Sequence, residues 1–518
     1  MRTTVLLLGI VGYLSWIPRL SAQTPYGASS PLGNGNQPYI TSNQAYLGNG
    51  AFEIRLRGGL PNGVAYLGLA VASAQTTFNG IPVNLDFSQT NSLNLLFLDN
   101  QGRASFPIPL TALTNTAFAG GSFYAQAYFV DGTAPNGVAA SRGLRVTFTL
   151  PPLVYVGSNR GVPGPGFLVD PSGPAVTNTI NGVNQRVQGS VFSRDGRSLF
   201  VAGDMALTPN ITYADLSTGT PVWTNLHTFS SSLALSGIGL ALDDDNGLLW
   251  SLQLQSLSMA TLFGLDADPT SATFGSVVAS FPINNGGTPA YWAMNKTLRM
   301  AALGLLFTPG VVLVDVDPAS GTFGQVLANL VVPVSPGAVL PGVTGICFSR
   351  DGDQMYVAIQ NGGGQTGEVA RYSFSQAAWI DHDPATTITD NLGPFSNPPL
   401  PFGPNPISLS APEYGEDSDW FVVSGFGGPG GGWAGRVDLT NTGAGGWAFT
   451  PATGASLNEA WFSAVDPAGT SVAVAVLQSN GQGALEFFDP MTMAVTNIVN
   501  LPGSGGVSGS NLAPVAWR

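Results

Sequence analysis

The feature that most constrains this chain is a repeated pair of β-hairpins that begins near residue 152 and continues to the C-terminus. In the first hairpin, an apolar strand ends in a short polar turn and a second apolar strand follows, as in Val191–Gly196 and Leu199–Ala202. Apolar strands and tight turns that recur along a chain indicate an all-β repeat fold. Five further copies start with Leu242–Gly247, Trp292–Thr297, Cys347–Gly352, Tyr414–Asp419 and Val465–Gly469.

A second hairpin lies between successive copies of the first, and it occurs seven times. Leu262–Phe281 and Val311–Leu330 are the clearest examples, because both carry the turn Asp-x-Asp-Pro. The turns of the first hairpin recur at intervals of about 50–65 residues, which suits the blades of a β-propeller with loop insertions. The remaining second hairpins are Phe167–Ile180, Ile211–Leu226, Ala370–Ile388, Ala434–Phe449 and Ala484–Val499.

Seven second hairpins and six first hairpins leave one blade without its innermost strand. The C-terminal segment Leu512–Trp517 can supply this strand by pairing with Leu153–Gly157. Such a closure removes open sheet edges that would otherwise need protection. For residues 151–518 we therefore predict a seven-bladed β-propeller closed by the C-terminal strand, with six or eight blades as the alternative counts.

The preceding region, residues 24–150, shows short strands separated by turn clusters. Asp99–Gly102 is a hairpin turn between two of the strands. Six or seven strands in a region of this length suit two packed antiparallel sheets, so we expect a β-sandwich module. The strands read Ala51–Arg57, Val64–Ala72, Leu93–Leu98, Ala104–Leu110, Phe123–Val130 and Leu144–Leu150.

The first 22 residues have the composition of a secretory signal peptide. Arg2 supplies the positive start, Val5–Val11 is apolar, and the small residues Ser21 and Ala22 precede a cleavage point. A retained anchor is the alternative, although the apolar run is too short to span a bilayer. We therefore expect an exported protein, periplasmic or extracellular, with no membrane span.

The balance of charge and the single cysteine exclude several classes of function. Charged residues make up 9% of the chain, the formal charge is −13, and Lys296 is the one lysine. An acidic chain without a basic stripe has no means of neutralising phosphates, so we expect no nucleic-acid partner. Cys347 has no second cysteine to pair with, so stability has to come from packing and ring closure, and we expect a monomer.

Residues of catalytic or metal-binding type are few and scattered. His227 and His382 fall in different blades, so they form neither a zinc site nor a catalytic pair. Two acidic clusters, Asp243–Asp245 and Glu413–Asp419, both fall on turns of the first hairpin, where Asp and Asn are favoured for their conformation. A weakly held calcium ion is the alternative at the first cluster, and binding of a metal such as calcium or of a substrate is the alternative at the second. We expect no catalytic residues, no metal and no cofactor.

The loops that enter the innermost strands form the usual binding funnel of a propeller. Those loops are rich in Gly, Ser, Asn and Pro, and Arg186 and Glu459 are their ionisable residues. Tyr291 and Asn511 are further polar candidates. We predict that Arg186, Tyr291, Glu459 and Asn511 bind a ligand, since a lone Glu beside an Arg is more often an ion pair than an active site.

Two segments resemble known families. The turn Phe-Ser-Arg-Asp-Gly, at Phe192–Gly196 and Phe348–Gly352, resembles that of the lactonase-like, YVTN-type seven-bladed propellers. The region around Gly121–Gln126, with Leu47–Asn49 near Phe52, resembles a β-sandwich module of large exported bacterial proteins, although this copy lacks the cysteines that the module often carries.

Three hypotheses for function follow. The first is an exported propeller that binds a glycan, a peptide or an envelope component through loops on one face. The second, implied by the family resemblance, is a lactonase-like hydrolase. The third is a structural component of the cell envelope. The amino-acid sequence leaves the choice between binding and catalysis open, because fold does not determine function.

Overall fold

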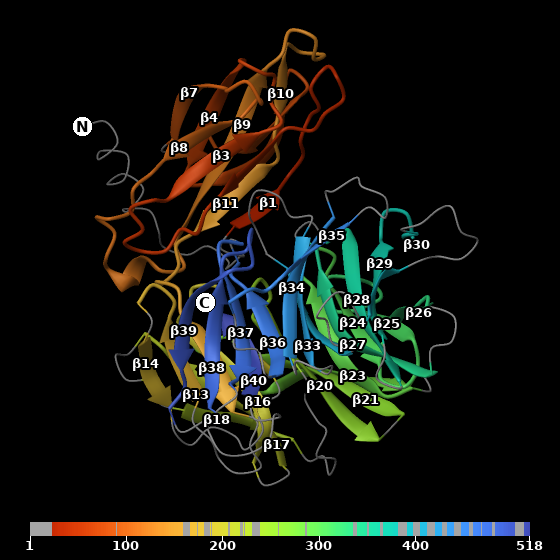
Figure 1. Ribbon diagram of the computed structural model, residues 1–518. Coiled ribbons are helices and arrows are strands. Elements are labelled where there is room, and N and C mark those ends of the chain that lie inside the picture. Colours follow the sequence, from red (N-terminus) through yellow and green to blue (C-terminus); the bar gives the residue numbers. More distant parts are fainter. Residues whose placement is uncertain are drawn as a thin grey trace. The chain divides into compact units, whose positions relative to one another are not determined.

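The computed structural model divides into two compact units, which we describe separately (Figure 1). Unit 1 extends to Pro151, and unit 2 holds most of the residues from Pro152 onward. In the described residues, one short 3-10 helix, η1 (Thr116–Phe118), accompanies 40 strands. The structure describes residues 23–518 except 90, 159–165, 174, 181–186, 188, 206–207, 218–220, 222, 230–238, 257, 285–286, 335–338, 350–351, 363–365, 382–390, 397–404, 412–419, 427–431, 440–446, 455–458, 468, 479–481 and 503–511.

Unit 1 contains three antiparallel sheets. The largest has the order β1-β11-β9-β4-β7, with β10 also paired to β9; the second has the order β2-β3-β8, and the third is the hairpin β5-β6. The bounds are β1 (Gln23–Tyr26), β2 (Tyr39–Ser42), β3 (Glu53–Arg57), β4 (Val64–Ala70), β5 (Ser73–Phe78), β6 (Ile81–Leu85), β7 (Asn91–Phe97), β8 (Ala104–Pro107), β9 (Ser122–Val130), β10 (Val138–Ala140) and β11 (Gly143–Thr147).

One hydrophobic core joins the two larger sheets of unit 1. Strand β3 alternates between half-buried and buried residues, so that Ile54 and Leu56 point to one face. These two side chains share a core cluster with Leu67 of β4 and Phe123 of β9. The period-two alternation of a strand with one solvated face therefore explains how the shorter sheet covers the longer one.

Unit 2 contains seven sheets, counted over the described residues. Six have four strands, and the fifth has an additional strand, β31, paired with β29. The first four sheets comprise β12 (Val154–Ser158), β13 (Gly166–Asp170), β14 (Ala175–Ile180) and β40 (Leu512–Trp517); β15 (Gly189–Phe192), β16 (Ser198–Met205), β17 (Thr208–Asp215) and β18 (Trp223–Thr228); β19 (Leu240–Asp243), β20 (Leu248–Ser256), β21 (Met259–Asp266) and β22 (Val277–Asn284); β23 (Pro289–Asn295), β24 (Met300–Leu305), β25 (Gly310–Asp315) and β26 (Val326–Val331). The last three comprise β27 (Val339–Phe348), β28 (Gln354–Gly362), β29 (Thr366–Ser373), β30 (Ala378–Trp379) and β31 (Leu392–Ser396); β32 (Asn405–Ser410), β33 (Trp420–Phe426), β34 (Gly432–Asp438) and β35 (Ala448–Pro451); β36 (Glu459–Val465), β37 (Val472–Leu477), β38 (Gly483–Phe488) and β39 (Val495–Asn500).

The first sheet is built from both ends of unit 2. Strand β40 pairs antiparallel with β12, with Val154 opposite Trp517 and Tyr155 opposite Ala516. The pairing predicted between Leu512–Trp517 and Leu153–Gly157 is therefore confirmed. The backbone N–H of Arg518 adds a hydrogen bond of 2.8 Å to the carbonyl of Leu153.

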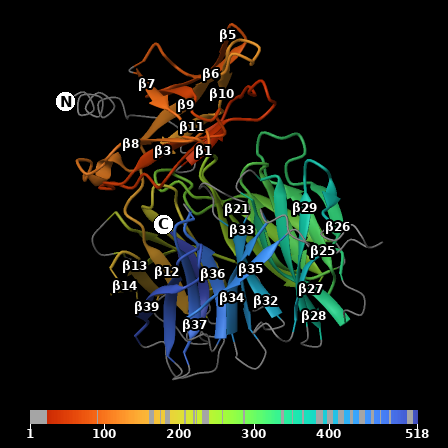
Figure 2. The same cartoon turned by 45° about the horizontal axis from the view of Figure 1, so that its top comes forward.

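A separate hydrophobic core lies between each sheet of unit 2 and the next. For example, Trp250 of the third sheet shares a cluster with Trp292 of the fourth. The series returns to its start, because Val154 and Phe167 of the first sheet share a cluster with Leu485 of the seventh. The sheets thus follow one another around a ring, as the views of unit 2 in Figures 1 and 2 show. The clusters between the other neighbouring pairs likewise consist mainly of aliphatic and aromatic side chains.

In the part of the chain that the structure describes, no helix has both the length and the apolar character needed to cross a membrane.

Candidate functional site

The sequence predicts a ligand site at the loops that enter the innermost strand of each of the seven sheets. One strand of each sheet contacts the corresponding strand of the next sheet, and the last of them contacts the first. We call these seven the innermost strands. In ring order they are β40, β15, β19, β23, β27, β32 and β36.

Two of the four predicted ligand-binding residues lie on innermost strands. Tyr291 is in β23, opposite Gly304, next to a register shift after Pro289. Its side chain is half-buried, and burial raises the pKa of the phenol, so Tyr291 is a neutral donor and acceptor at neutral pH. Glu459 is the first residue of β36 and lies opposite Leu477.

These two residues do not come from neighbouring strands. Strands β27 and β32 lie between β23 and β36 in the ring, so Tyr291 and Glu459 belong to the fourth and seventh sheets. The other two predicted residues, Arg186 and Asn511, lie outside the described residues. The predicted group of four therefore remains a prediction.

Serine side chains on the innermost strands connect neighbouring sheets. Ser408 Oγ of β32 lies 3.3 Å from both the backbone N–H and the carbonyl oxygen of Ser463 in β36, donating to the carbonyl and accepting from the N–H. The backbone N–H of Val465 donates to Ser410 Oγ at 2.8 Å. From β33, the strand next to β32, Ser424 Oγ donates to Ser463 Oγ at 3.2 Å. Because these hydroxyls bond to the adjacent sheet, they hold the ring together.

Two tryptophans make the same kind of connection. Trp292 Nε1 donates to the carbonyl of Gly239 at 3.2 Å, and Trp517 Nε1 donates to the carbonyl of Ala464 at 3.0 Å. Each bond runs from an innermost strand back to the preceding sheet. Buried indole N–H groups that find acceptors combine packing with hydrogen bonding.

The acidic cluster Asp243–Asp245 forms a turn. Asp243 is 5% exposed, and its Oδ1 accepts hydrogen bonds from the backbone N–H groups of Asp245 and Asn246 at 3.2 and 3.4 Å. Asp245 Oδ2 lies 3.5 Å from Arg299 Nη2 of the next sheet. In the described residues, no three His, Cys, Asp or Glu side chains gather as a metal ion would require. The cluster Glu413–Asp419 lies outside those residues.

The described histidine and the single cysteine have structural surroundings. His227 lies on β18, with Nδ1 3.2 Å from the carbonyl of Gly275 and its ring against Phe229. Cys347 lies on β27 and is buried, and burial raises the pKa of its thiol. His382 lies outside the described residues.

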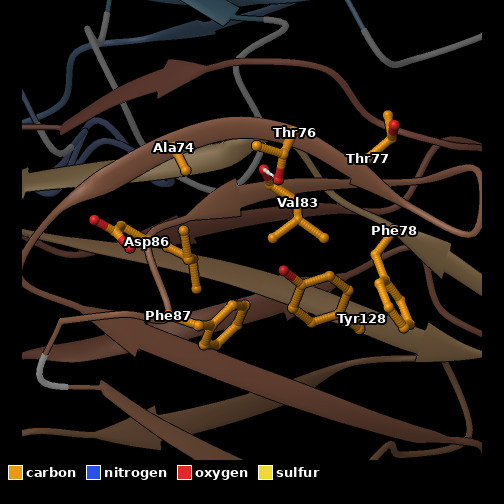
Figure 3. A pocket seen from close by; sticks show the side chains of 9 residues that line it. Ala74, Thr76, Thr77, Phe78, Val83, Asp86, Phe87 and Tyr128 are labelled. Carbon is orange, nitrogen blue, oxygen red and sulfur yellow. Dashed lines mark hydrogen bonds between the residues drawn. The ribbon is translucent and has the colours of Figure 1, made fainter.

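Unit 1 contains a pocket that the sequence analysis did not anticipate (Figure 3). It has a volume of about 440 Å³ and lies between the β5-β6 hairpin and Tyr128 of β9. The signal that could have revealed the hairpin is the pair Asn79-Gly80, a strong two-residue hairpin turn. The lining residues are Ala74, Thr76, Thr77, Phe78, Val83, Leu85, Asp86, Phe87 and Tyr128.

No family model matches the chain, and no curated protein matches it in sequence. Solved structures do resemble it. A protein from Lactobacillus plantarum has 13% identity and a TM-score of 0.50, covering 71% of this chain and 99% of its own. A candidate 6-phosphogluconolactonase from Bacteroides uniformis has the same identity and TM-score, covering 71% of this chain and 100% of its own.

These similarities define the class of the fold. The chain contains a β-propeller, built mainly from four-stranded antiparallel sheets, with the fold of these solved structures. At 13% identity the likeness concerns the fold alone, and the activity has to be argued from the site.

Proposed function

We propose that residues 151–518 form a seven-bladed propeller that works as an exported binding module. Loops on one face would present Arg186, Tyr291, Glu459 and Asn511 to a glycan, a peptide or an envelope component. The observation that carries the proposal is the closed series of hydrophobic cores, one between each sheet and the next, including the last and the first. A ring held at every junction is a rigid support for loops, which is how binding sites are commonly built.

The polar groups on the innermost strands favour binding over catalysis. The serines and tryptophans described above hydrogen-bond to adjacent sheets, so they are engaged in structure. General acid–base catalysis needs a positioned group with a tuned pKa. Within the described bounds of the innermost strands, Glu459 is the one carboxylate at the start of a strand. A single carboxylate supports recognition better than turnover.

The N-terminal region completes the proposal. We infer that residues 1–22 are a signal peptide and that residues 24–150 are a β-sandwich module, so the protein would work in the periplasm or outside the cell. The shared core of the two larger sheets of unit 1 supports the sandwich. The chain has one cysteine, which is buried and cannot form a disulfide within the chain, so the fold would not depend on disulfides in an oxidising compartment.

The second candidate is a lactonase-like hydrolase. It is favoured by the likeness to a candidate 6-phosphogluconolactonase over 71% of this chain. A phosphorylated lactone requires cationic side chains to receive its phosphate. The seven innermost strands, within their described bounds, include no lysine or arginine. The loops that lead into these strands carry Arg186, so a phosphate site there has to be tested by assay.

Assays of turnover and binding separate the two candidates. The purified protein would be given 6-phosphogluconolactone, unphosphorylated lactones and simple esters, with and without divalent metal ions. We expect no turnover above background. We also expect labelled protein to bind at least one component of a glycan and peptide array, with weaker binding in Tyr291→Ala and Glu459→Gln at unchanged melting temperature. Lactone hydrolysis that Glu459→Gln abolishes without loss of fold would show instead that the protein is a hydrolase.

A further inference from the structure

The pocket of unit 1 is built on a tight hairpin. Asn79 and Gly80 both have positive φ, of 49° and 77°. This conformation is typical of a two-residue turn, and it places Phe78 opposite Ile81. Phe78 is therefore fixed at the end of β5, at the rim of the pocket.

Three aromatic rings line the pocket. Phe78 is 69% exposed and Phe87 is 41% exposed, while Tyr128 is half-buried. Figure 3 shows Tyr128 between Phe87 and Phe78. The apolar surface continues beyond the pocket, because Tyr66 pairs with Tyr128 across β4 and β9 and is itself exposed. Contiguous exposed aromatic surface of this kind marks a binding site.

The polar groups of the pocket are mainly hydrogen-bond acceptors. Asp86 Oδ1 accepts bonds from the backbone N–H and the hydroxyl of Ser88, at 2.9 and 2.6 Å, and these bonds lower the pKa of the carboxyl. Thr76 Oγ1 donates to the carbonyl of Val83 at 3.4 Å, and the Tyr128 hydroxyl donates to Gln126 Oε1 at 2.7 Å. Both oxygens keep lone pairs with which to accept.

The lining excludes some ligands and favours others. No lysine, arginine or histidine lines the pocket, and Asp86 is ionised at neutral pH, so an anionic ligand is disfavoured. Rings arranged in a row suit an extended ligand better than a single small cation, which calls for a compact aromatic cage. The matching ligand is uncharged, donates several hydrogen bonds and has an apolar face.

We propose that this pocket binds a neutral oligosaccharide. The C–H faces of pyranose rings would stack on Phe78, Tyr128 and Phe87, and sugar hydroxyls would donate to Asp86 and to the threonine oxygens. This site is separate from the loops of unit 2 and does not depend on the function proposed for them.

The test is titration of the full-length protein with neutral hexasaccharides. Suitable probes are the hexamers of β-1,4-linked glucose, mannose, xylose and N-acetylglucosamine, and of α-1,4- and β-1,3-linked glucose. We expect at least one to bind. Phe78→Ala and Phe87→Ala should each weaken binding about three- to tenfold, the range for loss of one aromatic contact. Phe78→Trp should retain binding, and Asp86→Asn should weaken it.

One variant provides the control. Phe307→Ala removes another exposed phenylalanine, in unit 2, and should leave the affinity unchanged. The proposal is wrong if no hexasaccharide binds at millimolar concentration, or if Phe78→Ala and Phe87→Ala both bind with the affinity of the wild-type protein. It is equally wrong if only tetramethylammonium or an apolar dye binds in a Phe78-dependent manner.

Discussion

The indole Nε1 of Trp517 donates a hydrogen bond to the carbonyl oxygen of Ala464 across 3.0 Å. Trp517 belongs to β40, the last strand of the chain, and Ala464 belongs to β36 of the seventh sheet. The ring of Trp517 also meets Phe487 edge to face, with centroids 5.9 Å apart. This bond therefore links the strand that completes the first sheet to the sheet that precedes it in the ring.

Replacement of Trp517 by Phe should destabilise the protein. The variant keeps an aromatic ring but loses the hydrogen bond, which is typically worth about 1 kcal/mol. Trp223→Phe is the matched control, because Trp223 also packs edge to face, against Tyr155, and its buried N–H has no acceptor in the described structure. Urea unfolding should show a larger loss for Trp517→Phe than for Trp223→Phe. Equal losses of unfolding free energy in the two variants would mean that the Trp517 hydrogen bond does not stabilise the protein.

Acid should weaken the Asp-x-Asp-Pro turns. Burial alone would raise the pKa of Asp315, but hydrogen bonds from Ser320, Thr322 and the backbone of Asp317 outweigh burial, so the pKa lies below its usual 3.8. The stability that follows from a lowered pKa is present above about pH 4 and is lost as pH falls through the folded-state pKa. Urea unfolding from neutral pH down to about pH 2.5 should show this loss.

Thr322→Val tests the origin of that acid sensitivity. Thr322 Oγ1 donates to Asp315 Oδ2 at 2.5 Å, and its removal should cost about 0.5–1.5 kcal/mol at neutral pH and less in acid. Thr496→Val is the control, since its hydroxyl donates at 3.1 Å to an uncharged carbonyl, that of Phe487. The cost of the control should not change with pH. A pH-independent cost for Thr322→Val would contradict the assignment.

Cys347 should react slowly in the native protein. The residue is buried on β27, and burial raises the pKa of the thiol, so little reactive thiolate forms at neutral pH. A chromogenic disulfide reagent should modify the protein at a rate set by unfolding, and should react at once after denaturation in urea. Rapid labelling of native protein would place the thiol at the surface.

Much of the fold of unit 2 could be predicted because its strands are strongly apolar and its turns repeat. The turns at Asp195, Asp243 and Asn295 recur because the same side-chain bonds to the backbone form at each, as in Asn295 Oδ1 with the N–H groups of Thr297 and Leu298. Pairing of β40 with β12 followed from counting strands. The apolar strands and the turn residues are local features of the sequence, and their recurrence in sheet after sheet makes the pattern easy to recognise.

The binding surfaces were harder to predict. Strand β5 is mostly polar and largely exposed, and it lacks the alternation that indicates a strand, so the hairpin and its pocket were missed. The predicted grouping of Tyr291 with Glu459 depended on which loops approach each other. The approach of two loops is determined by the packing of blades that are far apart in the chain. The identity of a single loop residue does not indicate that packing.

Deletion of residues 511–518 tests the central claim, that the C-terminal strand closes the ring, most directly. The deletion removes β40, the strand that pairs with β12 and contacts both β15 and β36. The exposed edge of β12 would then favour aggregation. We predict that the shortened protein has a markedly lower unfolding temperature and elutes as aggregates, and that a synthetic peptide of residues 511–518 restores part of its stability. A shortened protein that stays soluble, monomeric and as heat-stable as the full chain would contradict ring closure.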